Sequence, residues 1–143
     1  MKKLVIAVLA IAGAYYAFEQ SRPVGQVDAT NPAPGAQPKQ SRDQWRSGDQ
    51  VRGTGTVSRI LSDDSDGSRH QRFILQLSSG KTLLIAHNID LAPRIASLRE
   101  GDTVSFYGEY ESNEQGGVIH WTHHDPQGRH AAGWLEHEGQ RYQ

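Results

Sequence analysis

The chain has 143 residues, a length that supports one domain of ordinary size together with terminal extensions. It contains no cysteine, so disulfide bonds and thiolate metal sites are excluded, and any transition-metal site must use His, Asp or Glu side chains. The formal net charge is −1, but residues 43–143 carry ten Lys or Arg against fourteen Asp or Glu, and this net charge of −4 counts against bulk nucleic-acid binding.

The first 18 residues have the composition of a targeting segment. Two lysines precede fifteen uncharged, mostly apolar residues at positions 4–18, and such a positive flank stays in the cytoplasm. Small residues at 12–14 favour a cleaved signal peptide, whereas aromatic residues at 15, 16 and 18 favour a retained signal anchor. Both interpretations stay open. Both predict that the rest of the chain is periplasmic or extracellular, either secreted or anchored to the inner membrane by residues 4–18.

Residues 19–42 are predicted to form a disordered linker rich in Pro, Gln and Ala. They hold four of the six prolines and show no apolar periodicity. Such a composition buries too little apolar surface to offset the entropy lost on ordering the chain. We therefore expect a flexible tether here, followed by a folded domain over residues 43–143.

The first part of that domain has the period-two pattern of β-strands. Residues 50–61 form one predicted strand, and the turn-rich segment SDDSDGS follows it. HQRFILQL at 70–77 and TLLIAHNI at 82–89 flank the turn SSGK and predict a β-hairpin. A two-residue turn at Ser79-Gly80 places Arg72 opposite His87. The other face of this hairpin then carries the predicted core residues Phe73, Leu75, Leu77, Leu84 and Ala86.

One short helix is predicted over residues 90–101 (DLAPRIASLREG). Asp90 is a suitable N-cap, Gly101 fits the C-terminal stop, and the apolar residues 91, 95 and 98 fall on one face. Two further strands are predicted at 102–112 and 116–124, joined by the turn NEQGG, and residues 129–143 are predicted to add a short hairpin.

The resulting order β-β-β-α-β-β resembles that of an oligonucleotide/oligosaccharide-binding (OB) fold, in which five strands close a small barrel and the helix covers one end. The fold class is therefore predicted as mainly β: a five-stranded OB-like barrel with one short helix and a C-terminal hairpin extension. A split, open sheet with one helix is the competing topology.

The OB topology brings polar residues from distant segments to one end of the barrel. The third and fifth strands run parallel in that fold, so residues 87–88 and 123–125 come to the same end. The start of the second strand and the end of the first fall there too. Helix capping by Asp90 and core packing of Trp121 are the structural alternatives to ligand contact. Ligand binding is predicted for His70, Arg72, Asn88, Asp90, Arg94 and Trp121.

Four of the seven histidines lie in HWTHHDPQGRH at residues 120–130. Alternation along a strand sends neighbouring side chains to opposite faces, so one ion cannot take all four. A site needs His120 with His124, or His123 with Asp125, supplemented by a histidine from another segment. Imidazoles with a carboxylate suit one divalent transition metal, zinc first, whereas solvated or hydrogen-bonded histidines are the alternative. The preferred metal ligands are His87, His123, His124 and Asp125.

Three segments carry a resemblance to a known family: HNIDLAPR at 87–94, GEYESNEQGGVIHWTHHDP at 108–126 and GRHAAGW at 128–134. They resemble a family of small secreted or membrane-anchored bacterial proteins defined only as a domain of unknown function. The likeness covers roughly residues 48–142. It implies a domain located in the cell envelope and no particular activity.

Three functions fit these residues. The first is an extracytoplasmic binding module whose histidine-rich polar site holds a small glycan or nucleotide-like ligand. The second is a metal-dependent extracytoplasmic hydrolase, such as a phosphodiesterase or nuclease, in which the metal activates water. The third is a metal-handling or envelope interaction protein without turnover. No residue is assigned a catalytic role, and the membrane is a partner if the targeting segment is uncleaved.

Overall fold

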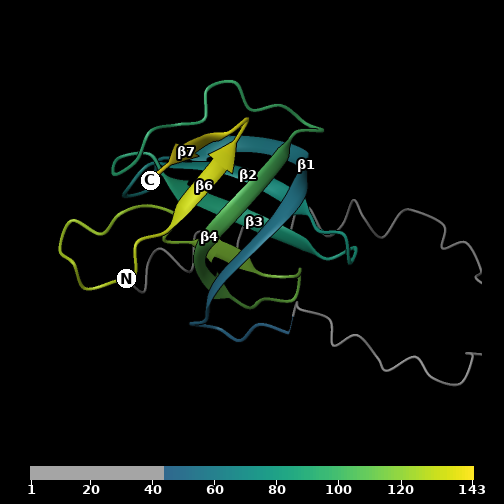
Figure 1. Cartoon of the computed structure of the whole chain (residues 1–143), viewed down its shortest axis with the longest axis horizontal. Coiled ribbons are helices and arrows are strands. Elements are labelled where there is room, and N and C mark those ends of the chain that lie inside the picture. Colours follow the sequence, from purple (N-terminus) through teal and green to yellow (C-terminus); the bar gives the residue numbers. More distant parts are fainter. Residues whose placement is uncertain (1–43) are drawn as a thin grey trace, which may run out of the picture. The chain divides into compact units, whose positions relative to one another are not determined.

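The computed structural model describes residues 44–143, which form seven strands of one sheet (Figure 1). The predicted targeting segment, residues 1–18, and the predicted linker, residues 19–42, lie outside the described residues. In the part of the chain that the structure describes, no helix is long and apolar enough to cross a membrane. The strands are β1 (Gln50–Asp64), β2 (His70–Gln76), β3 (Thr82–Asn88), β4 (Thr103–Glu111), β5 (Val118–His120), β6 (Trp134–His137) and β7 (Gln140–Tyr142).

Five of the strands form a closed ring of pairings. β1 pairs with β2, β2 with β3, β3 with β5, β5 with β4, and β4 returns to β1. All of these pairs are antiparallel except β3 with β5, which run parallel as predicted. The mainly β fold class is confirmed, and the ring is compatible with the OB-like architecture. The C-terminal hairpin is confirmed as well, because β6 pairs with β4 and β7 with β6.

β1 closes the ring because it pairs along its first half with β4 and along its second half with β2. Gly53 marks a close approach between β1 and β4. A Cβ atom at this position would lie 2.6 Å from Phe106 Cζ, so only glycine leaves the Phe106 ring its place in the core. The apolar core includes Val51, Val57, Phe73, Leu75, Leu83, Ile85, Val104, Phe106, Ile119 and Leu135.

The hairpin of β2 and β3 has a different register from the predicted one. Residues 78–80 form a three-residue loop, and its last residue, Gly80, has φ = 86°. A three-residue loop with positive φ at its last position is a common hairpin connection. The predicted loop had two residues, so every pair shifts by one position. Arg72 lies opposite Ala86 and not opposite His87.

With this register, the face of β3 that packs beside Phe73 and Leu75 is the opposite of the predicted one. Leu83, Ile85 and His87 point into the core. Leu84 and Ala86, predicted as core residues, are buried as expected, but on the opposite face of the strand and outside the main core cluster. The sequence pattern did not discriminate between the faces because β2 and β3 bury residues on both sides. The length of the connecting loop therefore decides the register.

The helix predicted over residues 90–101 is wrong: turns and irregular chain connect β3 to β4. The buried side chain of Gln71 takes both backbone groups of Ile95, accepting from its N–H at 2.9 Å and donating to its carbonyl at 3.0 Å. Those groups are then not available to a helix. Ile95 still fills the core, while Leu91 is 44% exposed.

β5 ends at His120, and not at residue 124 as predicted. Trp121 has φ = 55°, a left-handed conformation that turns the chain away from the strand direction. Residues 121–133 then form a loop, named loop 121–133 below. At its base the Gly133 N–H donates to the His123 carbonyl at 3.0 Å.

Candidate metal centre

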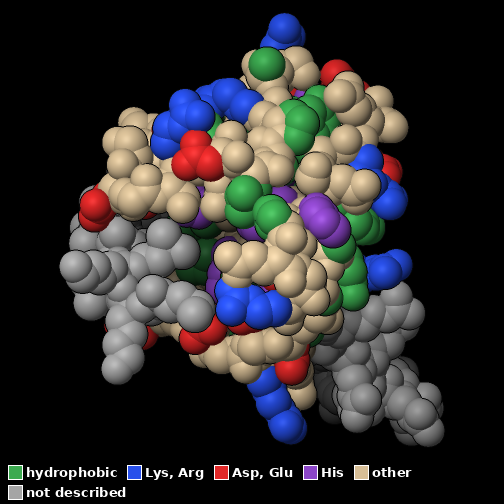
Figure 2. All heavy atoms as spheres, turned by 90° about the vertical axis from the view of Figure 1, so that its left-hand side faces the viewer, with side chains coloured by type: hydrophobic (Ala, Val, Ile, Leu, Met, Phe, Trp, Pro, Cys, Tyr) green, Lys and Arg blue, Asp and Glu red, His purple; other side chains and the backbone are tan. Residues whose placement is uncertain are grey.

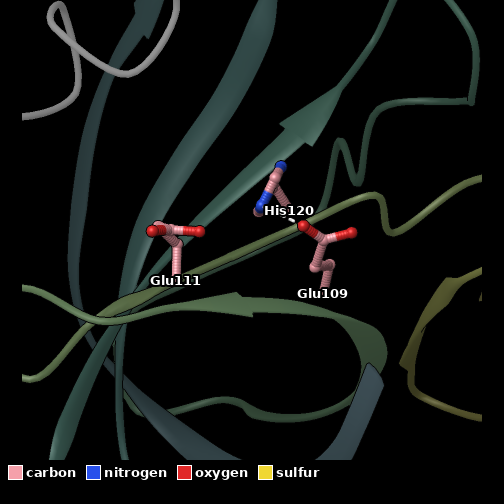
Figure 3. Close-up of side chains that lie close together, drawn as sticks. All are labelled: Glu109, Glu111 and His120. Carbon is pink, nitrogen blue, oxygen red and sulfur yellow. Dashed lines mark ion pairs between the residues drawn. The ribbon is translucent and has the colours of Figure 1, made fainter. Parts of the chain in front are cut away.

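Glu109, Glu111 and His120 form a compact group on the outer face of the ring (Figure 3). Alternation along β4 buries residues 104, 106, 108 and 110, so the two glutamates point outward. β5 places His120 directly opposite Glu109. One ligand atom from each side chain lies within 4.8 Å of the others. Among residues 44–143 this is the one group of three or more His, Asp or Glu side chains that can hold a metal ion.

His120 has a buried ring nitrogen without a hydrogen bond. Its Nε2 is buried without a hydrogen-bond partner and lies 3.6 Å from Glu109 Oε1, which is too far for a hydrogen bond. Burial lowers the pKa of His120 below its usual value, although the Glu109 and Glu111 carboxylates act in the opposite direction. The neutral imidazole, the form that binds metals, is therefore favoured.

His130 orients Glu109 from the side of loop 121–133. Its Nε2 is hydrogen-bonded to Glu109 Oε2. The His130 ring stacks on Trp121, with ring centroids 4.2 Å apart and an interplanar angle of 7°. Burial lowers the pKa of His130, but the Glu109 hydrogen bond and charge outweigh it, so the pKa is raised overall. A fixed partner of this kind holds a carboxylate in one orientation.

Asp125 shapes the loop that delivers His130. Its Oδ1 accepts a hydrogen bond from the Gln127 N–H at 2.9 Å. Its Oδ2 accepts from the N–H groups of Arg129 and His130, at 2.8 and 2.9 Å. Both carboxylate oxygens of Asp125, a predicted metal ligand, are thus used inside loop 121–133.

His87, another predicted metal ligand, is fully buried and has both ring nitrogens hydrogen-bonded. Nε2 lies 3.1 Å from the Pro93 carbonyl and Nδ1 lies 2.8 Å from Thr122 Oγ1. A carbonyl can only accept, so Nε2 carries the proton and Nδ1 accepts from the threonine hydroxyl. Burial, with smaller contributions from the charges of His123 and His70, lowers the pKa of His87 to about 4.

The structure does not bring the four predicted metal ligands together as one group. His123 is buried and its Nδ1 donates to the His124 carbonyl at 2.8 Å. The His124 side chain is exposed. In the described part of the chain, no three of the side chains of His87, His123, His124 and Asp125 bring their ligand atoms within 4.8 Å of one another.

The residues predicted to bind a ligand fall into two sets. The first set lies on β2 and β3 and consists of His70, Arg72 and Asn88. His70 is paired with Asn88 across the two strands, and His70 and Arg72 are buried. Burial lowers the pKa of His70 below its usual value. Figure 2 shows histidine side chains beside hydrophobic ones on one face of the molecule, some of them set back in a hollow.

The second set is engaged in contacts within the chain. Asp90 forms an ion pair with Arg69 at 2.7 Å, and Arg94 forms one with Asp63. Trp121 stacks on His130, as described above.

Glu109 and Glu111 were missed by the sequence analysis. A signal was present: two glutamates at i and i+2 share one face of a predicted strand, and the next strand brings a histidine back beside them. The pairing of Glu109 with His120 depends on where the turn NEQGG begins and ends. The predicted ends of the two strands beside this turn did not define that pairing.

Residues 25–143 match the family described as Protein of unknown function (DUF3465), and the chain belongs to this family. The family-level resemblance noted in the sequence is thereby confirmed. No curated protein matches the sequence. The description of the family states no activity, so a function must be argued from the side chains.

Proposed function

We propose that this DUF3465 member is a metal-binding module of the cell envelope that holds one divalent transition metal, zinc, through Glu109, Glu111 and His120. Carboxylate oxygens with an imidazole nitrogen suit zinc, and a chain without cysteine has no softer ligand to offer. One observation carries the proposal: the buried, unpartnered Nε2 of His120 lies beside two carboxylates.

A bound metal would supply what this group lacks. Buried polar atoms in folded proteins nearly always have a partner, and a cation would give one to His120 Nε2 while it neutralises two glutamates. Three protein ligands leave a further coordination position open. His130 and Trp121 hold Glu109 in place, in the manner of the outer partners that orient metal ligands.

Metal binding is favoured over binding of a glycan or nucleotide alone. Asp90 and Arg94, two of the residues predicted to contact such a ligand, are already ion-paired with Arg69 and Asp63. The glutamates and His120 are gathered on neighbouring strands, and His120 Nε2 has no hydrogen-bond partner.

A location outside the cytoplasm is part of the proposal. It is supported by the lysine-flanked apolar segment at residues 4–18 and by the proline-rich residues 19–42 after it. The domain would then meet its metal in the periplasm or outside the cell.

The test is zinc binding by the full-length chain, measured by calorimetry and by metal analysis with mass spectrometry. We expect one zinc per chain, lost in the His120→Ala variant. His124→Ala is the matched control, because it removes an exposed imidazole that the sequence alone had suggested as a ligand. Zinc retained in His120→Ala and lost in His124→Ala would reject the site in favour of the other ligand set.

A further inference from the structure

Several buried polar atoms of the described residues are unsatisfied. Among the described residues, four buried side-chain nitrogens lack a hydrogen-bond partner: Gln50 Nε2, Arg72 Nη1, His120 Nε2 and His137 Nδ1. Folded proteins contain few such atoms, and each calls for a physical explanation. The first three lie on one row of paired positions that runs around the outside of the ring through its five strands.

The strand registers define this row. Gln50 of β1 lies opposite Glu109 of β4, which lies opposite His120 of β5. β5 runs parallel to β3 with Ile119 beside Ile85, so the next position along both strands sets His120 beside Ala86. Ala86 in turn lies opposite Arg72 of β2. Ala86 is thus the position between Arg72 and His120 along the row.

Arg72 carries a buried positive charge that has no counter-charge among residues 44–143. The residue is 5% exposed. Its Nε and Nη2 both donate to the Ser62 carbonyl, at 2.9 and 2.7 Å, while Nη1 has no partner. No carboxylate of residues 44–143 forms an ion pair with it. A buried guanidinium in this state costs several kcal/mol in desolvation, as an order of magnitude, unless an anion joins it.

The geometry points to a phosphate-class oxyanion as the ligand that completes the row, with one oxygen on the metal and another accepting a hydrogen bond from Arg72. The inference rests on the proposed function, because the metal supplies one of the two contacts. The Arg72 guanidinium and the metal both attract an acceptor of negative charge, whereas the lone pair of His120 Nε2 binds the metal. Arg72 provides the planar N–H fork that matches phosphate oxygens.

The spacing favours phosphate over carboxylate. Arg72 and His120 stand two strands apart, which is about 10 Å between their backbones. A phosphate group directs its oxygens to several sides and can reach a metal on one side and a guanidinium on the other. A carboxylate presents both oxygens on one edge. Ala86, between the two positions, has a side chain that ends at its Cβ.

The experiment measures the affinity of inorganic phosphate for the zinc-loaded full-length chain by calorimetry, with acetate at equal ionic strength as the carboxylate probe. We expect phosphate to bind more tightly than acetate. In Arg72→Met the phosphate affinity should fall by about tenfold or more, the loss of one charge-assisted hydrogen bond, and Arg72→Lys should fall less. Arg99→Met removes an exposed arginine elsewhere and should leave the affinity unchanged. Glycerol phosphate in place of inorganic phosphate shows whether a free or an esterified phosphate is preferred; either preference supports the site.

The failure of this inference can be distinguished from the failure of the metal site. If zinc binds normally and phosphate binds Arg72→Met as tightly as it binds the unaltered chain, the phosphate inference is wrong and the metal site stands. The same conclusion follows if acetate binds as tightly as phosphate. Absence of zinc binding rejects the proposed function, and phosphate binding that still depends on Arg72 would then support an anion site without metal. Folding is checked by thermal unfolding. Without phosphate, Arg72→Met should be no less stable than the unaltered chain, because an unpaired buried charge is removed.

Discussion

At the scale of the residue, His87 joins three segments of the chain. It belongs to β3, its Nε2 donates to Pro93 in the connection to β4, and its Nδ1 accepts from Thr122 at the start of loop 121–133. These bonds need a neutral ring, because the Nδ1 position must accept. Burial supplies that state by lowering the pKa of His87 to about 4.

Replacing His87 with Gln is expected to remove part of the acid sensitivity of the fold. The pKa of His87 is about 4 in the folded chain and 6.5 in the unfolded chain. The folded state therefore binds fewer protons between these values, so the contribution of His87 to stability is fully present above pH 6.5 and is lost as the pH falls towards 4. The loss amounts to about 3 kcal/mol when protonation is complete.

The measurement is the free energy of unfolding in urea at pH 7 and at pH 4.5. His87→Gln should be less stable at pH 7, where it forfeits well-placed hydrogen bonds, and should lose less stability than the unaltered chain on going to pH 4.5. His124→Gln, at an exposed position, should keep the full acid sensitivity. An unchanged pH dependence in His87→Gln would contradict this account.

At the scale of the element, loop 121–133 acts as a support for the candidate metal centre. It begins at the left-handed Trp121, is folded on Asp125, and ends after setting His130 against Glu109. Asp125 thus acts at a distance from the centre, through the position of His130.

The Asp125→Ala variant is expected to loosen this support without removing the metal ligands. Three backbone N–H groups lose their acceptor, so the thermal unfolding midpoint should drop by several degrees. Zinc should still bind at one per chain, with weaker affinity, because Glu109 loses a fixed partner. Thermal unfolding and calorimetry measure both effects. Complete loss of zinc, as in His120→Ala, would show that Asp125 is itself a ligand.

Elements differ in how well their sequence predicts them. β4 and the β6–β7 hairpin alternate clearly, and both were predicted. The hairpin of β2 and β3 was predicted as an element, but its register was not, because both of its faces are apolar and the loop of residues 78–80 decides the pairing. The helix at 90–101 satisfied every local rule and lost to the tertiary hydrogen bonds of Gln71 with Ile95.

At the scale of the whole molecule, the candidate site exists only through ring closure. β4 pairs with β5 on one side and with β1 on the other, so Glu109 is flanked by His120 and Gln50 from opposite directions of the chain. Arg72 joins the row through β2 and β3. The topology was predicted from the sequence, but a one-residue error in one hairpin changed which side chains share a face.

Zinc is therefore expected to stabilise the folded ring as a whole. The unfolded chain does not hold Glu109, Glu111 and His120 together, so a metal that binds only the folded state raises its stability by about 2.7 kcal/mol at a free concentration one hundred times Kd. For a domain of this size the thermal unfolding midpoint should rise on the order of 10 °C. Glu111→Gln should abolish most of this rise, and Glu114→Gln, the same change at an exposed position on the β4–β5 turn, should leave it intact. Addition of a chelator should return the unaltered chain to its metal-free midpoint. An equal rise in Glu111→Gln and Glu114→Gln would mean that zinc stabilises the domain from somewhere other than the outer face of β4 and β5.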